Sequence, residues 1–169
     1  MAREHARIFV AVWGDRDFRA LDRDEQRMYF TLVSQANLTY CGSLDYIPSR
    51  LASLAADEDE VSVEHSVKLL EAGRFVVMDR TTQEVLVRSF VRWDGLLDSP
   101  NMTKAMLKAR AALISDDLRS VVDSELWRAF REDPKRKGWP GFKQAAPELF
   151  RQVSMKGSGN PFEKGQGKG

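Results

Sequence analysis

The sequence predicts an α+β fold, and two kinds of pattern lead to this class. Apolar residues recur with the 3.6-residue period of a buried helix face over residues 22–36, 49–56 and 60–72. Over 75–78 and 84–91, β-branched and alternating apolar residues instead suit two strands joined by a polar turn. Helices combined with a β-hairpin make an α+β fold.

In the N-terminal third of the chain, the sequence predicts a strand, a helix and a short extended segment. Ile8–Trp13 is rich in β-branched and aromatic residues, so it predicts a first strand, which the polar stretch Gly14–Asp17 would end. The helix over 22–36 begins at Asp22, a residue that suits the N-cap. Residues 43–47 are then expected to be extended.

Two short helices come next. Pro48 and Ser49 suit the start of the helix over 49–56, and Asp59 can cap the helix over 60–72, which Gly73 would end. Two short helices joined by a tight turn and followed by a hairpin are typical of a winged helix-turn-helix. We therefore predict this domain within residues 8–92, with the second helix able to enter the DNA major groove and the hairpin as the wing.

The remaining chain predicts a C-terminal helical extension. Residues 98–101 (Asp-Ser-Pro-Asn) are a natural boundary, because the residue before Pro disfavours helix and Asn can cap the next helix. Helices are expected over 102–113 and 116–131, and a short helix ending near Val153. The predicted parts are a winged helix-turn-helix domain over 1–98, a helical extension for dimerisation or partner docking over 99–153, and a disordered basic tail over 154–169.

The extension carries more apolar surface than two short helices can hide alone. It is expected to pack on the winged helix, on a second copy of the chain or on another partner. The residues concerned are Met102, Met106, Leu113, Leu118, Val122, Leu126 and Phe130.

Charge is distributed unevenly, although the chain as a whole has a net charge of +1. Residues 1–100 contain 12 Lys and Arg against 17 Asp and Glu, whereas residues 131–169 contain 9 against 4. Non-specific DNA affinity depends on neutralising phosphates with basic side chains. The predicted DNA-binding domain is therefore acidic, and the basic excess lies after it in the chain.

Candidate DNA contacts fall into three groups. Ser49 and Arg50 open the first helix of the pair, where backbone N–H groups and a guanidinium favour phosphate. Ser62, His65 and Lys68 are expected on the exposed face of the second helix, where Lys68 can read guanine. The wing tip offers Arg80, Thr81, Thr82 and Gln83, and Arg74 and Arg88 are expected to flank it.

The turn between the two helices, residues 57–60, is wholly acidic. Carboxylates near phosphates are unfavourable, so we expect this turn to point away from the duplex or the affinity to be modest. Glu64 and Glu71 on the second helix suit a solvated helix face at least as well as a contact to a base.

Several other classes of protein find no support. A Gly-rich phosphate loop, a His-Glu-x-x-His motif and a Gly-x-Ser-x-Gly motif are absent, so we predict no enzyme activity. One cysteine and two histidines cannot build a structural zinc site, and neither a metal nor a cofactor is expected. Because no apolar run reaches membrane-spanning length and the first residues lack a signal-peptide pattern, no membrane contact and a cytoplasmic location are expected.

Several stretches carry a resemblance to a family. They are MAREHARIFVAVWGDRDFRALDRDEQRMYFTL, CGSLDYIPSRLASLAAD, LLEAGRFVVMDRTTQEVLVRSFVRWDG and GWPGFKQAAPELF. They resemble helix-turn-helix DNA-binding proteins encoded by bacteriophages of actinobacteria. More distantly, the first hundred residues are similar to the N-terminal winged-helix domain of phage replisome organisers and DnaD-type primosome proteins. The resemblance implies DNA binding in phage replication or regulation, inside a bacterial host cell, and the acidic turn departs from that pattern.

We therefore predict a phage-type winged-helix DNA-binding protein that acts in replication initiation or transcription regulation. The alternative is a non-enzymatic interaction protein that binds a host protein through the winged helix or the C-terminal helices. The expected partners are double-stranded DNA, a second copy of the chain as a homodimer, and a host or phage replication protein.

Overall fold

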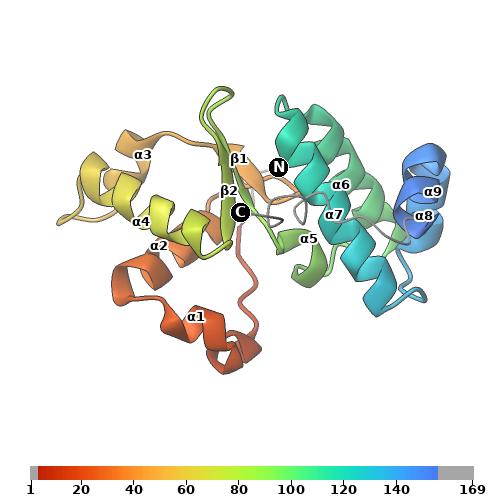
Figure 1. The fold of residues 1–169 in the computed structure, drawn as a ribbon, viewed down its shortest axis with the longest axis horizontal. Helices are drawn as coiled ribbons and strands as arrows, with labels where there is room; N and C mark the ends of the chain where they lie inside the picture. The colour runs from red at the N-terminus through yellow and green to blue at the C-terminus, as the bar shows by residue number, and fades with distance from the viewer. Residues whose placement is uncertain (1–3, 156–169) are drawn as a thin grey trace, which may run out of the picture.

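A three-stranded antiparallel sheet lies between two groups of helices in the computed structural model, which describes residues 4–155 (Figure 1). The strand order is β1–β3–β2. Val76 pairs with Val87 and Asp79 with Glu84, so residues 80–83 form the tip of the β2–β3 hairpin. The predicted hairpin is confirmed, but its second strand ends at residue 87 instead of 91. The strands are β1 (Ser43–Asp45), β2 (Val76–Asp79) and β3 (Glu84–Val87).

Three predicted helices lie on one side of the sheet. Helix α2 begins with a capping box, in which Asp22 accepts from the Glu25 N–H at 2.8 Å and Glu25 accepts from the Asp22 N–H at 2.7 Å. Helices α3 and α4 pack against each other, and α4 has the predicted bounds because Asp59 caps it. The bounds are α2 (Arg23–Val33), α3 (Pro48–Ala52) and α4 (Glu60–Ala72).

The predicted first strand is wrong. Residues 10–14 form a 3₁₀-helix, η1 (Val10–Gly14), and the helix α1 (Arg16–Ala20) follows it. The apolar residues here are consecutive and do not alternate, and they join an aromatic cluster instead of a sheet. The Trp13 ring lies 5.8 Å from the ring of Phe18, centroid to centroid. Asp15 caps α1 by accepting from the Phe18 N–H at 3.1 Å, a signal that the prediction used only as a stop.

Five helices make up the rest of the described chain. A short helix, α5, replaces the end of the predicted second hairpin strand, and two helices replace the single one expected near Val153. Pro147 divides those two, because Ala146 before it is held in a non-helical conformation. Ser154 and Met155 end the last helix, and the rest of the predicted tail, 156–169, lies outside the described residues. The bounds are α5 (Phe90–Trp93), α6 (Pro100–Ala112), α7 (Asp116–Glu132), α8 (Trp139–Ala145) and α9 (Pro147–Met155).

The helical extension and the first part of the chain share one hydrophobic core. Leu118, Val122 and Leu126 of α7 are buried in the same cluster as Val85 and Val87 of β3. Of the three alternatives for the apolar surface of the extension, packing on the chain's own first part is the one observed for these residues.

Polar contacts reinforce this junction at the hairpin. The buried carboxylate of Glu84 accepts from the N–H groups of Ile114 and Ser115 at 3.0 and 2.8 Å, just before α7 begins. A hydrogen bond from the Ser115 hydroxyl, together with the Thr82 and Thr81 N–H groups, holds the pKa of Asp79 below its usual value. Both ends of the hairpin turn are thus tied to the loop between α6 and α7.

Helices α6 and α8 approach closely because α8 has glycines at its N-cap, Gly138, and at its third residue, Gly141. The Gly138 N–H donates to the Leu97 carbonyl at 2.9 Å, and a Cβ at Gly138 would meet Leu97 and the Thr103 hydroxyl. A Cβ at Gly141 would lie 2.6 Å from the backbone carbonyl oxygen of Pro100. Backbone atoms cannot move aside as a flexible side chain can, so α8 would have to shift.

We predict that Gly141→Ala lowers the free energy of unfolding by about 1–3 kcal/mol through overpacking. Gly14→Ala is the matched control, because a Cβ there meets nothing within 4 Å. Urea denaturation of both variants measures the effect. Equal midpoints for the two variants would show that α8 does not depend on this close approach.

Candidate nucleic-acid interface

Helices α3 and α4 place the first two groups of predicted contacts on the surface. Ser49 and Arg50 are exposed at the start of α3, and His65 and Lys68 are exposed on α4. The Ser62 hydroxyl donates to the Asp59 carboxylate at 2.6 Å, and the Ser62 N–H donates to the same oxygen at 2.8 Å. Ser62 therefore completes the cap of α4 in this structure.

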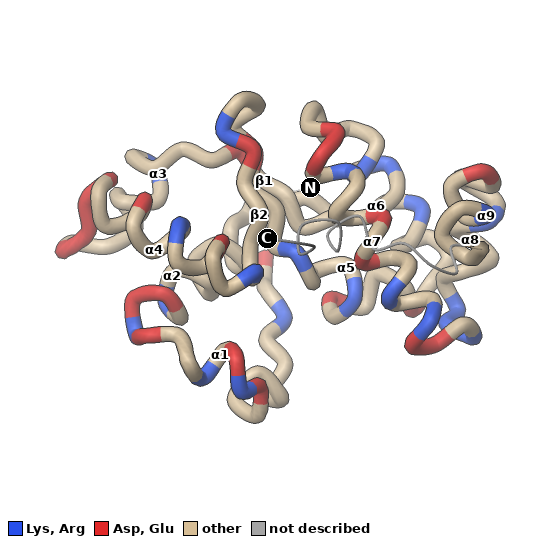
Figure 2. Tube along the Cα trace, in the orientation of Figure 1, with Lys and Arg blue, Asp and Glu red and all other residues tan. Residues whose placement is uncertain are grey.

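The N-terminal end of α4, which the sequence prediction places in a major groove, is acidic. Asp57, Asp59 and Glu60 are exposed there, whereas Glu58 turns back and accepts from Arg27 of α2 at 2.8 Å. Figure 2 shows the acidic positions of the turn between α3 and α4 in red. We expected the acidic turn either to point away from a duplex or to keep the affinity modest. The exposure of these side chains favours modest affinity, because carboxylates repel phosphates.

The tip of the β2–β3 hairpin presents Arg80, Thr81 and Gln83 to solvent, while Thr82 is half-buried. Arg80 pairs with Glu71 of α4 at 3.2 Å. The N–H groups of Thr81 and Thr82 donate to Asp79, so they are already used within the turn. The tip thus offers one guanidinium, which a carboxylate partly neutralises.

Arg74 and Arg88 do not flank the tip, so their predicted position is wrong. The strand register places Val76 opposite Val87 at the other end of the hairpin, and both arginines lie just outside that pair. Arg88 Nε donates to the Arg74 carbonyl at 2.6 Å, and Arg88 Nη1 contacts Glu125 of α7 at 3.3 Å. These two side chains belong to a different surface.

That surface is built around Glu125, whose side chain is only 2 % exposed. Its carboxylate contacts Arg88, Arg92 at 3.2 Å and Arg128 at 2.8 Å. Arg92 also pairs with Glu132 at 2.5 Å, and Arg136 donates to the Arg92 carbonyl at 3.0 Å. Arg131 follows Arg128 on α7 and lies 5.1 Å from the Trp127 ring centroid. We call Arg74, Arg88, Arg92, Arg128, Arg131 and Arg136 the arginine stripe.

The arginine stripe holds an excess of positive charge. Within residues 4–155, Glu125 pairs with Arg88, Arg92 and Arg128, and Glu132 pairs with Arg92. Burial lowers the pKa of Arg88, and repulsion from Arg128, Arg92 and Arg74 lowers it further against the attraction of Glu125. Figure 2 shows basic positions on α5 and along α7 toward the loop after it. That loop adds the exposed Lys135 and Lys137.

The comparisons with protein-family models, with curated proteins and with solved structures gave no match. Function must therefore be inferred from the chain's own residues. No group of three or more His, Cys, Asp or Glu residues that could hold a metal is found within residues 4–155. In the same part of the chain, none of the helices is long and apolar enough to cross a membrane.

The sequence prediction missed four members of the stripe, which are Arg92, Arg128, Arg131 and Arg136. A weak signal was present on α7, because Arg128 and Arg131 are three residues apart, the spacing of one helix face. Periodicity could not show that α7 meets Arg88 and Arg92. Arg88 and Glu125 are separated by 37 positions in the chain, so only the tertiary fold brings them together.

We predict that Glu125→Gln lowers the free energy of unfolding by about 3 kcal/mol, because three arginines lose the carboxylate between them. Glu148→Gln is the control: its pair with Arg151 is exposed, and its loss should cost less than about 0.5 kcal/mol. Urea denaturation with and without added sulfate measures both. Sulfate should restore part of the stability of Glu125→Gln, since an anion can replace the lost charge. Equal stability of both variants would contradict the central role of Glu125.

Proposed function

We propose that the protein binds DNA, that α3, α4 and the β2–β3 hairpin form a winged helix, and that the arginine stripe makes most of the phosphate contacts. The observation that carries this proposal is the excess of guanidinium groups over carboxylates around Glu125. DNA affinity in general depends on how many phosphates basic residues neutralise. The role in phage replication or regulation implied by the sequence resemblance stays a prediction.

The guanidinium groups of the stripe suit phosphate better than they suit anions of low charge density. A guanidinium offers a planar fork of N–H donors that matches two oxygens of a phosphate. Arg88 and Arg128 keep about a third of their side-chain surface exposed, at 29 % and 33 %, while Glu125 beneath them is covered. A phosphate can therefore reach the outer N–H groups without displacing the buried carboxylate.

The surface of α3, α4 and the hairpin tip is expected to contribute less to DNA affinity than the arginine stripe. The exposed acidic residues at the start of α4 repel phosphates, and Arg80 is shared with Glu71. Contacts to the phosphates of the DNA position a protein on the duplex, whereas contacts to the bases specify the sequence. Lys68 can still read a base once the stripe holds the duplex. The exposed apolar residues Leu54 and Val61 at this surface instead favour the second candidate function, the docking of a partner protein.

We predict that Arg74→Asn combined with Arg131→Gln weakens binding to a DNA duplex more than roughly tenfold at about 0.1 M salt. The slope of log affinity against log salt should fall by about one unit for each lost phosphate contact. Asn is chosen at position 74 because the backbone there has a φ of 62°, which Asn tolerates. Fluorescence anisotropy of a labelled duplex at several salt concentrations measures both effects.

Two matched variants make this experiment decisive. Arg23→Gln removes a charge from a side chain that is 93 % exposed and far along the chain from the stripe, and it should leave affinity unchanged. Arg50→Gln combined with Arg80→Gln removes two charges from the helix pair and the hairpin tip, and it should weaken binding less than the stripe variant. If the Arg50 and Arg80 variant alone loses affinity, the helix pair and wing are the phosphate site and the stripe is structural. If the wild-type chain shows no salt-dependent binding, the proposed function is wrong.

A further inference from the structure

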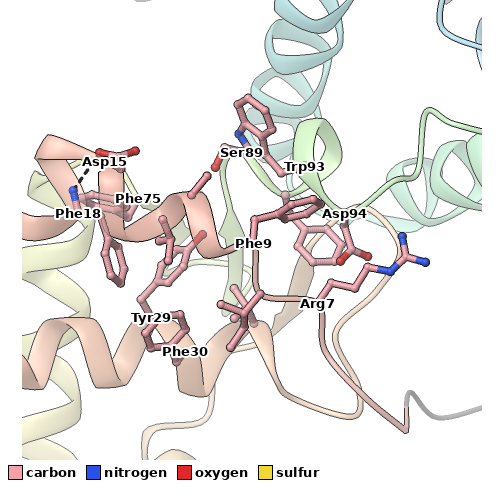
Figure 3. Close-up of a pocket in the computed structure, with 15 residues that line it drawn as sticks. Arg7, Phe9, Asp15, Phe18, Tyr29, Phe30, Phe75, Ser89, Trp93 and Asp94 are labelled. Carbon is pink, nitrogen blue, oxygen red and sulfur yellow. Dashed lines mark hydrogen bonds between the residues drawn. The ribbon is translucent and has the colours of Figure 1, made fainter.

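An open pocket of about 420 Å³ lies beside the arginine stripe. It is enclosed by the N-terminal segment from Arg7 to Val12, by α2 and by α5, as Figure 3 shows. This volume falls within the range of roughly 300–1,000 Å³ typical of sites for small molecules. The pocket is separate from the surface of α3, α4 and the hairpin tip.

The walls of the pocket are mainly apolar, and many of the apolar residues are aromatic. Phe18 and Phe75 line it together with Tyr29 and Phe30 of α2. Phe9 and Trp93 also line it, yet their exposed fractions are 50 % and 52 %. Side chains that serve only the core are normally buried, and exposed aromatic groups around a hollow are typical of a binding site.

A few polar groups stand among these rings. Burial and the nearby charge of Asp15 raise the pKa of Tyr29 against the opposing effect of Ser89, so the Tyr29 hydroxyl stays protonated and can donate. Figure 3 shows the Arg7 and Asp94 side chains at the same end of the pocket. Aromatic faces with donors and acceptors at the edge match the chemistry of a planar heterocycle that carries its own hydrogen-bonding groups.

Helix α5 connects the pocket to the arginine stripe. Ser89, Phe90 and Trp93 line the pocket, while Arg88 and Arg92 alternate with them in the chain and belong to the stripe. The Arg92 guanidinium lies 5.1 Å from the Trp93 ring centroid. One ligand can therefore place phosphates on the arginines and a ring against Trp93. Arginines combined with aromatic side chains are the usual means of holding a single strand.

We infer that the pocket takes an unpaired base of a single-stranded nucleic acid whose phosphates lie on the arginine stripe. This inference rests on the proposed function and adds a second form of ligand to it, a single strand that uses the same stripe as the duplex. A base inside a duplex is stacked and cannot enter the pocket, whereas an unstacked base can lie against Trp93 and Phe9. Stacking of one base on an aromatic side chain contributes about 1–3 kcal/mol, which corresponds to about 5- to 150-fold in affinity.

The test compares a labelled oligo-dT strand with a duplex of the same length, using the full chain. Trp93→Leu should weaken binding of the single strand at least about fivefold and leave duplex affinity unchanged. Tyr40→Leu is the matched control, because Tyr40 is an aromatic residue that is 49 % exposed and does not line the pocket. It should change neither affinity. Circular dichroism melting of each variant confirms that it is folded, and Phe9→Ala provides a second pocket variant if Trp93→Leu is not.

Five outcomes are distinguishable. Loss confined to the single strand in the Trp93 and Phe9 variants supports the pocket. The pocket is overturned if wild type and both variants bind the single strand equally. It is also overturned if the variants lose affinity equally for strand and duplex. In both cases the stripe still stands as a phosphate site. An oligo-dT strand with abasic positions should bind wild type as weakly as intact oligo-dT binds Trp93→Leu, and undiminished affinity would also overturn the pocket. If wild type binds neither strand nor duplex, the proposed function itself fails.

Discussion

The buried carboxylate of Glu125 is the contact on which the arrangement of this protein most depends. It joins α7 to the residues after the hairpin by accepting from Arg88 and Arg92, and it holds Arg128 of its own helix beside them. A single buried carboxylate would be costly, and it is tolerated here because three guanidinium groups satisfy it. The same contact has a second consequence. Because one negative charge gathers three positive ones, the junction between the two parts of the chain is also a strongly basic surface.

The protein therefore has two surfaces of opposite charge. The exposed carboxylates lie at the start of α4, and the arginine stripe begins beyond the end of α4 and runs along α7 (Figure 2). A polyanion approaching this molecule is attracted to one surface and repelled by the other, so the charge distribution orients the encounter. Under the proposed function, α4 is therefore not required to supply affinity and can discriminate between bases or contact a partner.

Local signals in the sequence were sufficient for part of the fold. The bounds of α4 were predicted correctly because a cap at Asp59 and a stop at Gly73 are read from neighbouring residues. The segment Ile8–Trp13 was misassigned because its composition suits a strand, while its conformation is set by contacts with α1 and α2 that the sequence does not display. The residues predicted as contacts on α3, α4 and the hairpin tip are exposed except Thr82, which is half-buried, and their contact with DNA stays a prediction. Arg88 was placed at the wrong end of the hairpin, because its partner Glu125 lies on a helix far along the chain.

We propose that the arginine stripe, and not the helix pair, receives the phosphates. The most direct measurement is an NMR titration of the ¹⁵N-labelled full chain with a DNA duplex, following backbone amides and arginine Nε–H groups. The account predicts that the largest shifts occur at Arg128, at Arg131 and in the amides of α7 around them, with small changes at Ser49 and Lys68. Shifts confined to α3, the start of α4 and the hairpin tip, with Arg128 and Arg131 unmoved, would contradict it.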